Sequence, residues 1–267
     1  MPVSADLYDR DYFLSHRCEG YEYFRAGELS HVRKHEIEAL RLEPGMRLLD
    51  AGCGRGEILR AAHDRGLRVA GIDYSEAAVA LSRETLADVA DADIRHGDVT
   101  RLPWGDDGFD RVLCGDVIEH LDAAQAEAAV NEFRRVLRPG GVVLVHTAPN
   151  RLFRNVSWPI LRHVLRFVGA AEPARLMDDY LADLIPYHVN EQSLASLRRL
   201  LDRAGLHDVR AWIDPDVTRS ASHRLTRDLA RGRLFTIGAR IAGTWPLIVL
   251  FGNDLYATGT KPVAATA

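Results

Sequence analysis

Short apolar runs alternate with helical patterns between residues 47 and 147 of the chain. Runs that read as strands occur at 47–50, 68–73, 94–98, 111–115 and 142–147. The last of them, VVLVHT, is continuously apolar, which is typical of a strand that is buried on both faces. This alternation predicts parallel strands joined by right-handed crossover helices. We therefore expect an α/β fold with one doubly wound sheet between two helical layers.

Capping residues mark where the helices of this region begin. Ser75 precedes the helical segment EAAVALSRETLADV, and its hydroxyl can accept a backbone N–H of the first turn. Asp122 stands in the same position before a helix that runs to about Leu137 and stops ahead of Pro139. A further helix is expected at about 57–66, where it ends at a glycine.

The pattern changes beyond Asn150. Residues 151–168 are rich in large apolar side chains interleaved with four arginines, and no acid occurs before Glu172. Regular alternation returns with a helix at 191–204 and strands at about 209–213 and 255–260. We expect one domain, which comprises N-terminal cap helices at 1–44, a core at 45–150, and lid or substrate insertions at 151–186 and 216–252.

The composition is that of a globular protein without a strong charge bias. The 267 residues carry a formal net charge of −4, so no global basic field favours nucleic acid as a partner. Three scattered cysteines, and an N-terminus that lacks the apolar core of a signal peptide, favour a cytoplasmic location. Residues 234–251 are apolar but contain Arg240 and Pro246, which favours a buried or membrane-surface segment over a spanning one.

A glycine-rich turn follows the first strand, in the sequence LLDAGCGRGEIL. Glycines between a strand and a helix let a ligand approach the backbone closely, because no Cβ stands in the way. The dinucleotide fingerprint G-x-G-x-x-G would need glycine where Glu57 stands, and an acid there would repel a pyrophosphate. Asp50 at the strand end likewise suits a cation. The turn therefore favours a cationic nucleoside over a dinucleotide.

Two more acids stand at the ends of the next strands. Asp73 ends the second strand, where a carboxylate can accept both ribose hydroxyls of an adenosine. Asp98 follows the third strand, where its carboxylate can accept from an adenine amino group while the Val99 N–H meets a ring nitrogen. We expect Asp50, Asp73 and Asp98 to converge on one crevice at the carboxyl edge of the sheet.

These segments together resemble the ordered motifs of class I S-adenosylmethionine (SAM)-dependent methyltransferases, of the ubiquinone-pathway-like, type 11 or type 23 groups. The motifs are LLDAGCGRGEIL, GIDYS, HGDVTRLPW, FDRVLCGDVIEHL and RRVLRPGGVVLVHTAPN, and NDLYATGTK fits the last strand. The resemblance covers roughly residues 45–150 and implies a seven-stranded Rossmann-like sheet with the last strand antiparallel. It implies that SAM is held at the methionine part by Asp50, Gly52, Gly54, Gly56 and the backbone of Cys114, at the ribose by Asp73 and Tyr74, and at the adenine by Asp98 and Val99.

The acceptor side depends on Asp116, Glu119, His120 and His188. If a helix begins after the fourth strand, Asp116 shares one face with Glu119 and His120. His188 precedes a helix that Asn190 can cap, and we expect His188 and His120 to act as catalytic bases toward an acceptor hydroxyl. The D-x-x-E-H pattern with a later histidine also resembles the E-x-x-E-H metal sites of ubiquinone-pathway O-methyltransferases and small-RNA 2′-O-methyltransferases. It implies a divalent metal held by Asp116, Glu119, His120 and His188, although Asp116 replaces the family's glutamate.

The two apolar insertions point to the kind of acceptor. They favour a small lipophilic or secondary-metabolite acceptor, methylated at a hydroxyl oxygen, over a small polar one. The basic, amphipathic segment 151–168 fits a core-facing helix, a cover for such an acceptor, or a helix at a membrane surface. A metal-assisted RNA 2′-O-methyltransferase and a non-catalytic SAM-fold binding protein stay as alternatives, and the sequence leaves the oligomeric state open.

Overall fold

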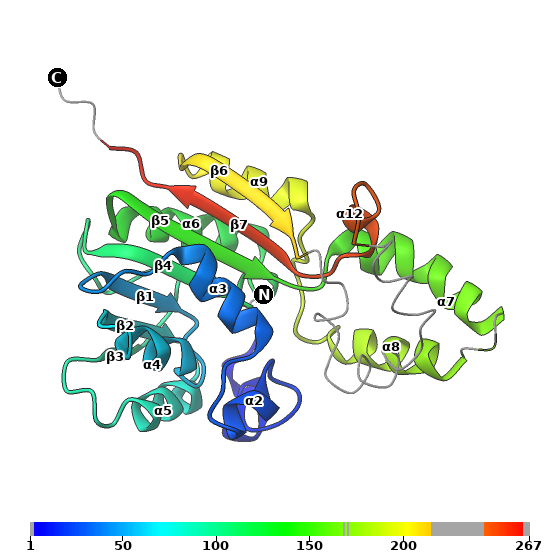
Figure 1. Ribbon diagram of the computed structural model, residues 1–267, viewed down its shortest axis with the longest axis horizontal. Helices are drawn as coiled ribbons and strands as arrows, with labels where there is room; N and C mark the ends of the chain where they lie inside the picture. Colours follow the sequence, from blue (N-terminus) through cyan, green and yellow to red (C-terminus); the bar gives the residue numbers. More distant parts are fainter. Residues whose placement is uncertain (1–2, 168, 170, 215–242, 264–267) are drawn as a thin grey trace.

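The computed structural model has a seven-stranded sheet at its centre (Figure 1). The structure describes residues 3–167, 169, 171–214 and 243–263. The strand order is β3-β2-β1-β4-β5-β7-β6, and β7 runs antiparallel to both of its neighbours. This confirms the expected doubly wound α/β sheet. The strands are β1 (Arg47–Ala51), β2 (Arg68–Asp73), β3 (Asp93–His96), β4 (Phe109–Gly115), β5 (Leu137–Thr147), β6 (His207–Ile213) and β7 (Leu255–Thr260).

Helices cover both faces of the sheet. α3, α4 and α5 pack on one face, and α6 and α9 pack on the other. The α-helices are α1 (Arg10–Phe13), α2 (Tyr21–Arg25), α3 (His31–Leu40), α4 (Glu57–His63), α5 (Glu76–Thr85), α6 (Ala123–Val136), α7 (Trp158–Phe167), α8 (Ala171–Asp183), α9 (Leu194–Arg203) and α12 (Ile248–Phe251). Single turns occur at η1 (Ala5–Leu7) and η2 (Ile118–His120), and η3 (Phe153–Ser157) is π-helical.

The predicted caps are largely confirmed, with one correction. The Ser75 side chain accepts the Ala78 N–H at the start of α5, and Asp122 forms a capping box with Gln125 on α6. The helix expected at 191–204 begins later, at Leu194, and Ser193 rather than Asn190 caps it. The difference leaves His188 to Gln192 as an irregular connection with bends at Val189 and Asn190.

Several strand boundaries also differ from the prediction by one to five residues, and two of these differences concern the third and fifth strands. The third strand ends at His96, so Asp98 lies in the loop beyond it. β5 begins at Leu137, five residues earlier than expected, because Leu137 pairs with Phe109 of β4 ahead of the apolar run.

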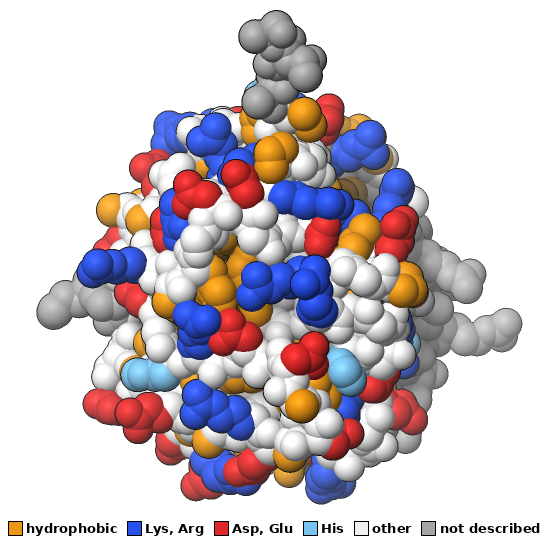
Figure 2. Space-filling model, turned by 90° about the vertical axis from the view of Figure 1, so that its left-hand side faces the viewer, with side chains coloured by type: hydrophobic (Ala, Val, Ile, Leu, Met, Phe, Trp, Pro, Cys, Tyr) orange, Lys and Arg blue, Asp and Glu red, His pale blue; other side chains and the backbone are white. Residues whose placement is uncertain are grey.

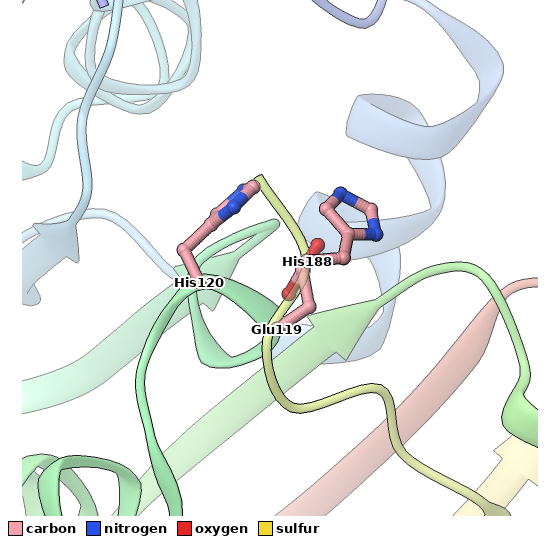
Figure 3. A group of neighbouring side chains, drawn as sticks. All are labelled: Glu119, His120 and His188. Carbon is pink, nitrogen blue, oxygen red and sulfur yellow. The ribbon is translucent and has the colours of Figure 1, made fainter. Parts of the chain in front are cut away.

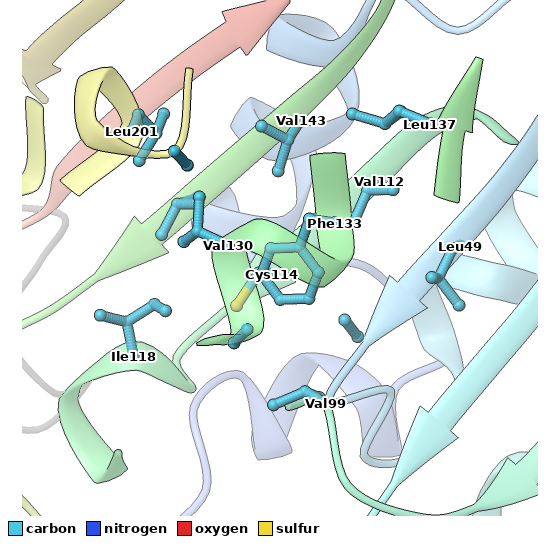
Figure 4. Packing of buried hydrophobic residues seen from close by; sticks show 14 of the residues in the cluster. Leu49, Val99, Val112, Cys114, Ile118, Val130, Phe133, Leu137, Val143 and Leu201 are labelled. Atoms are coloured by element: carbon cyan, nitrogen blue, oxygen red, sulfur yellow. The ribbon is translucent and has the colours of Figure 1, made fainter. Parts of the chain in front are cut away.

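The larger hydrophobic core lies between the sheet and the α6–α9 layer (Figure 4). Phe133, Val130 and Leu201 of these helices meet Val112 and Val143 of the sheet, and all five side chains are fully buried. Apolar burial of this extent fixes the strand ends in place, since each buried side chain of this size contributes about 1.5–3 kcal/mol. This packing holds the polar residues at the carboxyl ends of the strands, such as Asp50 and Asp73, in fixed positions.

The insertion after β5 forms a helical pair beyond the carboxyl end of that strand (Figure 1). α7 and α8 share a small core of their own, to which Phe153, Trp158, Ala174 and Leu181 contribute. The second expected insertion, 216–252, falls outside the described residues up to residue 242; its last part contains α12.

The described part of the chain contains no helix that is long and apolar enough to cross a bilayer. Figure 2 shows the face that carries the amino ends of the parallel strands, where basic and acidic side chains are interspersed without a patch of one sign.

Candidate functional site

The glycine turn after β1 is shaped by positive φ angles at Gly52, Gly54 and Gly56 (95°, 49° and 79°). A Cβ at Gly52 would lie 2.2 Å from Cγ2 of Val117. The turn after β1 and the turn after β4 are therefore in direct contact at a position where only glycine fits. A small pocket adjoins this contact and is lined by Cys18, Arg33, Asp50, Gly52, Cys53, Gly54, Arg55, Glu57 and Ile58.

Asp50 and Asp73 stand as expected at the carboxyl ends of neighbouring strands, and both are buried. The Asp73 carboxylate accepts the N–H of Gly54 at 3.0 Å and the N–H of Ser75 at 2.9 Å. Burial raises the pKa of Asp73 to about 6, and these two N–H groups oppose the shift. Asp73 therefore ties the glycine turn to the start of α5.

The remaining residues predicted to hold the cofactor differ in the solvent exposure of their side chains. Tyr74 is 37 % exposed, whereas Val99 and Cys114 are buried in the larger core. Asp98 is exposed, and its Oδ1 accepts the N–H of Thr100 at 2.8 Å. Because the Cys114 side chain packs in the core, only its backbone is available to a cofactor.

Asp116 does not lie on a helix with Glu119 and His120, contrary to the expectation. Its backbone is left-handed, with φ of 56°, and only Ile118–His120 form a single turn. The carboxylate instead accepts from Arg33 at 3.1 Å and lies 2.9 Å from Nδ1 of His146. These two cations lower the pKa of Asp116, against the opposing effect of burial, so it is ionised. The D-x-x-E-H spacing therefore does not bring four metal ligands together.

Glu119, His120 and His188 do come together (Figure 3). One ligand atom from each lies within 4.8 Å of the other two. The backbone carbonyl of Glu119 accepts the N–H groups of Val189 (2.9 Å) and Asn190 (3.0 Å), which fixes the connection that carries His188 against η2.

The two histidines lie close to each other and are largely withdrawn from solvent. Their ring centroids are 4.9 Å apart. His120 Nδ1 lies 2.9 Å from the carbonyl oxygen of Tyr187 and 2.9 Å from the hydroxyl of Tyr8. A carbonyl can only accept, so this contact places the proton on Nδ1 and leaves the Nε2 lone pair free.

Burial sets the protonation of the three side chains. It lowers the pKa of His120, and it lowers the pKa of His188 to about 3, with the neighbouring His120 adding to the second shift. Both rings are therefore neutral at neutral pH. Burial and the charge of Asp116 raise the pKa of Glu119 to about 8, and its Oε2 accepts the Thr147 hydroxyl at 2.8 Å.

A buried charge network next to the site was not predicted. Arg33 from α3 pairs with Glu36 and Asp116, and His146 from β5 lies 3.3 Å from a carboxylate oxygen of Asp254. Glu36 and His146 are at most 1 % exposed. Polar residues inside otherwise apolar segments, such as His146 in VVLVHT, are the sequence signal for this network.

The methyltransferase domain family model matches residues 49–145, the region that contains the glycine turn and the acidic strand ends. A Mycolicibacterium smegmatis protein named "Probable S-adenosylmethionine-dependent methyltransferase" is 40 % identical over 177 residues, 65 % of this chain and 58 % of that protein. A demethylmenaquinone methyltransferase from Staphylococcus epidermidis is 30 % identical over 42 % of this chain and 47 % of its own length. The chain thus spans about half the length of these curated relatives.

Among solved structures, phosphoethanolamine N-methyltransferase 2 of Haemonchus contortus in complex with S-adenosyl-L-methionine has the same fold. The TM-score is 0.63 at 18 % identity, over 98 % of this chain and 60 % of the other. The ordered motifs, the sheet with its antiparallel β7 and the matching family model lead to one assignment: residues 49–145 belong to a methyltransferase domain with the class I SAM-dependent fold.

Proposed function

We propose that the protein transfers a methyl group from SAM to a hydroxyl oxygen of a small, lipophilic acceptor. The observation that carries the proposal is the juxtaposition of the family's glycine turn with two neutral, neighbouring imidazoles, His120 and His188. The first element fits a cationic nucleoside, and the second fits the removal of a hydroxyl proton.

The residues around the turn fit SAM on chemical grounds. When bound, SAM supplies an electrophilic methyl group on a sulfonium. Asp50 offers a buried carboxyl group beside the turn, Asp73 accepts from ribose hydroxyls, and Gly52, Gly54 and Gly56 leave the backbone open to close approach. Tyr74, Asp98, Val99 and the Cys114 backbone are proposed to complete the binding surface.

The histidines are proposed as catalytic residues. Transfer breaks the carbon–sulfur bond and forms a carbon–oxygen bond, while the hydroxyl proton passes to an imidazole nitrogen. His188 suits this role because its Nδ1 is buried without a hydrogen-bond partner among the described residues. His120 is positioned by Tyr8 and Tyr187 and adds a second lone pair.

A lipophilic acceptor is supported by the surface beyond β5. α7 exposes Ile160 (65 %), Val164 (51 %) and Phe167 (92 %) along one side. This side suits a hydrophobic acceptor or peripheral contact with a membrane from the cytoplasm. The demethylmenaquinone methyltransferase relative is named for a quinone substrate, which supports the lipophilic part of the proposal.

A metal-assisted reaction is a second candidate, because Glu119, His120 and His188 lie together. Two neutral imidazoles and the Glu119 carboxyl group, which would give up its proton to a metal ion, suit a divalent transition metal such as Zn²⁺. The fit is incomplete, because the Thr147 hydroxyl occupies one oxygen of Glu119 and Asp116 is paired elsewhere. Metal analysis of the purified protein, with activity before and after chelation, separates this candidate from metal-free base catalysis.

The experiment for the main proposal combines binding with turnover. Isothermal titration should show binding of S-adenosylhomocysteine, and Asp73→Asn should weaken it by about tenfold, as expected for a lost hydrogen bond to a charged group. With a panel of lipophilic alcohols, phenols and matched amines, His188→Gln should lower kcat about 100-fold and leave this binding unchanged.

Four outcomes would contradict the proposal. Absence of S-adenosylhomocysteine binding removes methyl transfer, and turnover of amines alone removes the hydroxyl acceptor. Binding without turnover on any member of the panel favours a non-catalytic SAM-fold protein. Turnover of RNA with steeply salt-dependent binding favours the 2′-O-methyltransferase alternative.

A further inference from the structure

An open, polar pocket of about 310 Å³ lies next to the candidate site, on the side of the α7 insertion. It is lined by Arg151, Arg154, Asn155, His188, Asn190 and Glu191, together with Val189. His188 is shared between this pocket and the group it forms with Glu119 and His120. A molecule in the pocket therefore lies against the proposed base.

The arginines of this insertion are not equivalent. Arg162 and Arg166 both face Asp178, at 3.8 Å and 2.8 Å, and Arg154 pairs with Glu191. Arg151 has an exposed side chain and no carboxylate within ion-pair distance in the described part of the chain. Among the described residues, Arg151 is therefore the one of these four arginines without a carboxylate partner.

The charge of the pocket follows from these pairs. Arg154 is paired with Glu191, and Arg151 adds a positive charge that no described carboxylate balances. Asn155 and Asn190 add side-chain amides that can donate hydrogen bonds. A guanidinium beside amide donors suits a carboxylate or phosphate and repels a cation.

We propose that this pocket binds an anionic group, a carboxylate or a phosphate, of the methyl acceptor, with Arg151 as its main counter-charge. The inference rests on the proposed function and narrows it, because it makes the acceptor amphiphilic. The anionic group lies at Arg151, the hydroxyl meets His188, and the apolar part extends toward α7. Arg151 is thus a specificity-determining residue that takes no part in proton transfer.

The test uses probes that share an eight-carbon chain and differ in the head group. Octyl phosphate, octanoate, 1-octanol and octyltrimethylammonium are titrated calorimetrically into the full-length protein saturated with S-adenosylhomocysteine. At least one anion should bind about tenfold more tightly than octanol, the gain expected from hydrogen bonds to a charged group. The tighter of the two anions identifies the head group as phosphate or carboxylate.

Variants assign the effect to the pocket. Arg151→Gln should reduce anion binding to the octanol level, and Arg151→Lys should keep part of the preference because the charge remains. Arg166→Gln is the matched control, since Arg166 lies on α7, is paired with Asp178 and does not line the pocket. It should bind both anions as tightly as the wild-type protein does.

The inference is overturned if neither anion binds more tightly than octanol, if octyltrimethylammonium binds best, or if Arg151→Gln keeps the full preference. S-adenosylhomocysteine binding in the same samples separates this failure from failure of the proposed function. Intact nucleoside binding without an anion preference removes the pocket assignment alone. Loss of nucleoside binding in the wild-type protein removes methyl transfer.

Discussion

Gly52 connects the turn that is proposed to hold the cofactor with the turn that leads to His120. Its φ of 95° is strained for any L-residue, and Val117 occupies the space of a Cβ. We expect Gly52→Ala to lower the free energy of unfolding in urea by about 2 kcal/mol or more. Gly27→Ala is the control, because Gly27 has a φ of 73° but open space around its Cα, and it should cost about 1 kcal/mol. Equal costs would mean that the contact with Val117 is unimportant.

Glu119 should give the protein a measurable pH dependence. Its pKa is raised to about 8 in the fold, so between pH 4.5 and 8 the folded chain binds more protons than the unfolded chain. Its contribution to stability is complete below that window and is lost as the pH rises through about 8. Glu119→Gln, which mimics the protonated acid, should flatten this decline by at most about 1.4 kcal/mol per pH unit.

Thermal unfolding of Glu119→Gln and wild-type protein at pH 5.5, 7 and 8.5 measures this difference. Glu127→Gln, on the exposed side of α6, is the control and should follow the wild-type curve. If Glu119→Gln and wild-type protein lose stability in parallel across the window, Glu119 is ionised in the fold and the proposed protonation is wrong.

For individual residues of the candidate site, the sequence predicted the location of some side chains well and of others poorly. Asp50 and Asp73 lie where expected because a strand followed by a turn is a local pattern. Asp116 was placed wrongly, because its left-handed backbone is stabilised by Arg33 and His146, which come from distant segments. The contact of His120 with His188 depends on hydrogen bonds from Val189 and Asn190 to the Glu119 carbonyl, which no sequence spacing reveals.

Among the elements, the N-terminal segment covers the small pocket at the glycine turn. The buried Arg55 donates to the carbonyl oxygens of Phe13 (3.1 Å) and Glu19 (2.5 Å), and it pairs with Glu57. This pocket, about 30 Å³, admits only a small part of a nucleoside, so we expect α1 and α2 to move when one binds. Arg55 therefore connects this N-terminal segment to the start of α4.

Arg55→Lys should loosen the segment, because one ammonium cannot reproduce the forked contacts of the guanidinium. Amide hydrogen exchange at residues 8–25 should become about tenfold faster, equivalent to about 1.4 kcal/mol. Arg10→Lys is the control, since Arg10 forms an exposed pair with Glu84 and should leave exchange nearly unchanged. Unchanged exchange in Arg55→Lys would show that apolar contacts, such as Phe13 with Leu81, hold the segment instead.

The order of strands and helices in the core was predictable, because each element has its own apolar period and cap. The segment 151–186 was predicted only as an insertion. Its helices form because Phe153, Trp158 and Leu181 pack together and because Trp158 donates to Asp178, which lies 20 residues further along the chain. Such pairing is set by tertiary packing, which a periodicity of 3.6 residues does not specify.

For the whole molecule, the separate core of α7 and α8 predicts two levels of stability. The sheet is buried on both faces, whereas the insertion has a small cluster of its own beyond the strand ends. Amides of β4 and β5 should exchange only on global unfolding, and amides of α7 and α8 should exchange at least tenfold faster by local opening. Hydrogen-exchange mass spectrometry on the full chain resolves the two classes.

S-adenosylhomocysteine should slow exchange by global unfolding of the sheet but not exchange by local opening of α7 and α8. At a concentration 100 times its Kd, a ligand that binds only the folded state adds about 2.7 kcal/mol, which slows exchange by global unfolding about 100-fold. Local opening of α7 and α8 leaves Asp50, Asp73 and the glycine turn intact. The ligand should therefore not change the exchange rates of the α7 and α8 amides. Asp73→Asn at the same ligand concentration is the control and should show a smaller effect on the sheet, because its Kd is higher. If the ligand slowed α7 and α8 as much as it slowed the sheet, the insertion would open only together with the cofactor site, and its role would be to enclose the nucleoside rather than to select the acceptor.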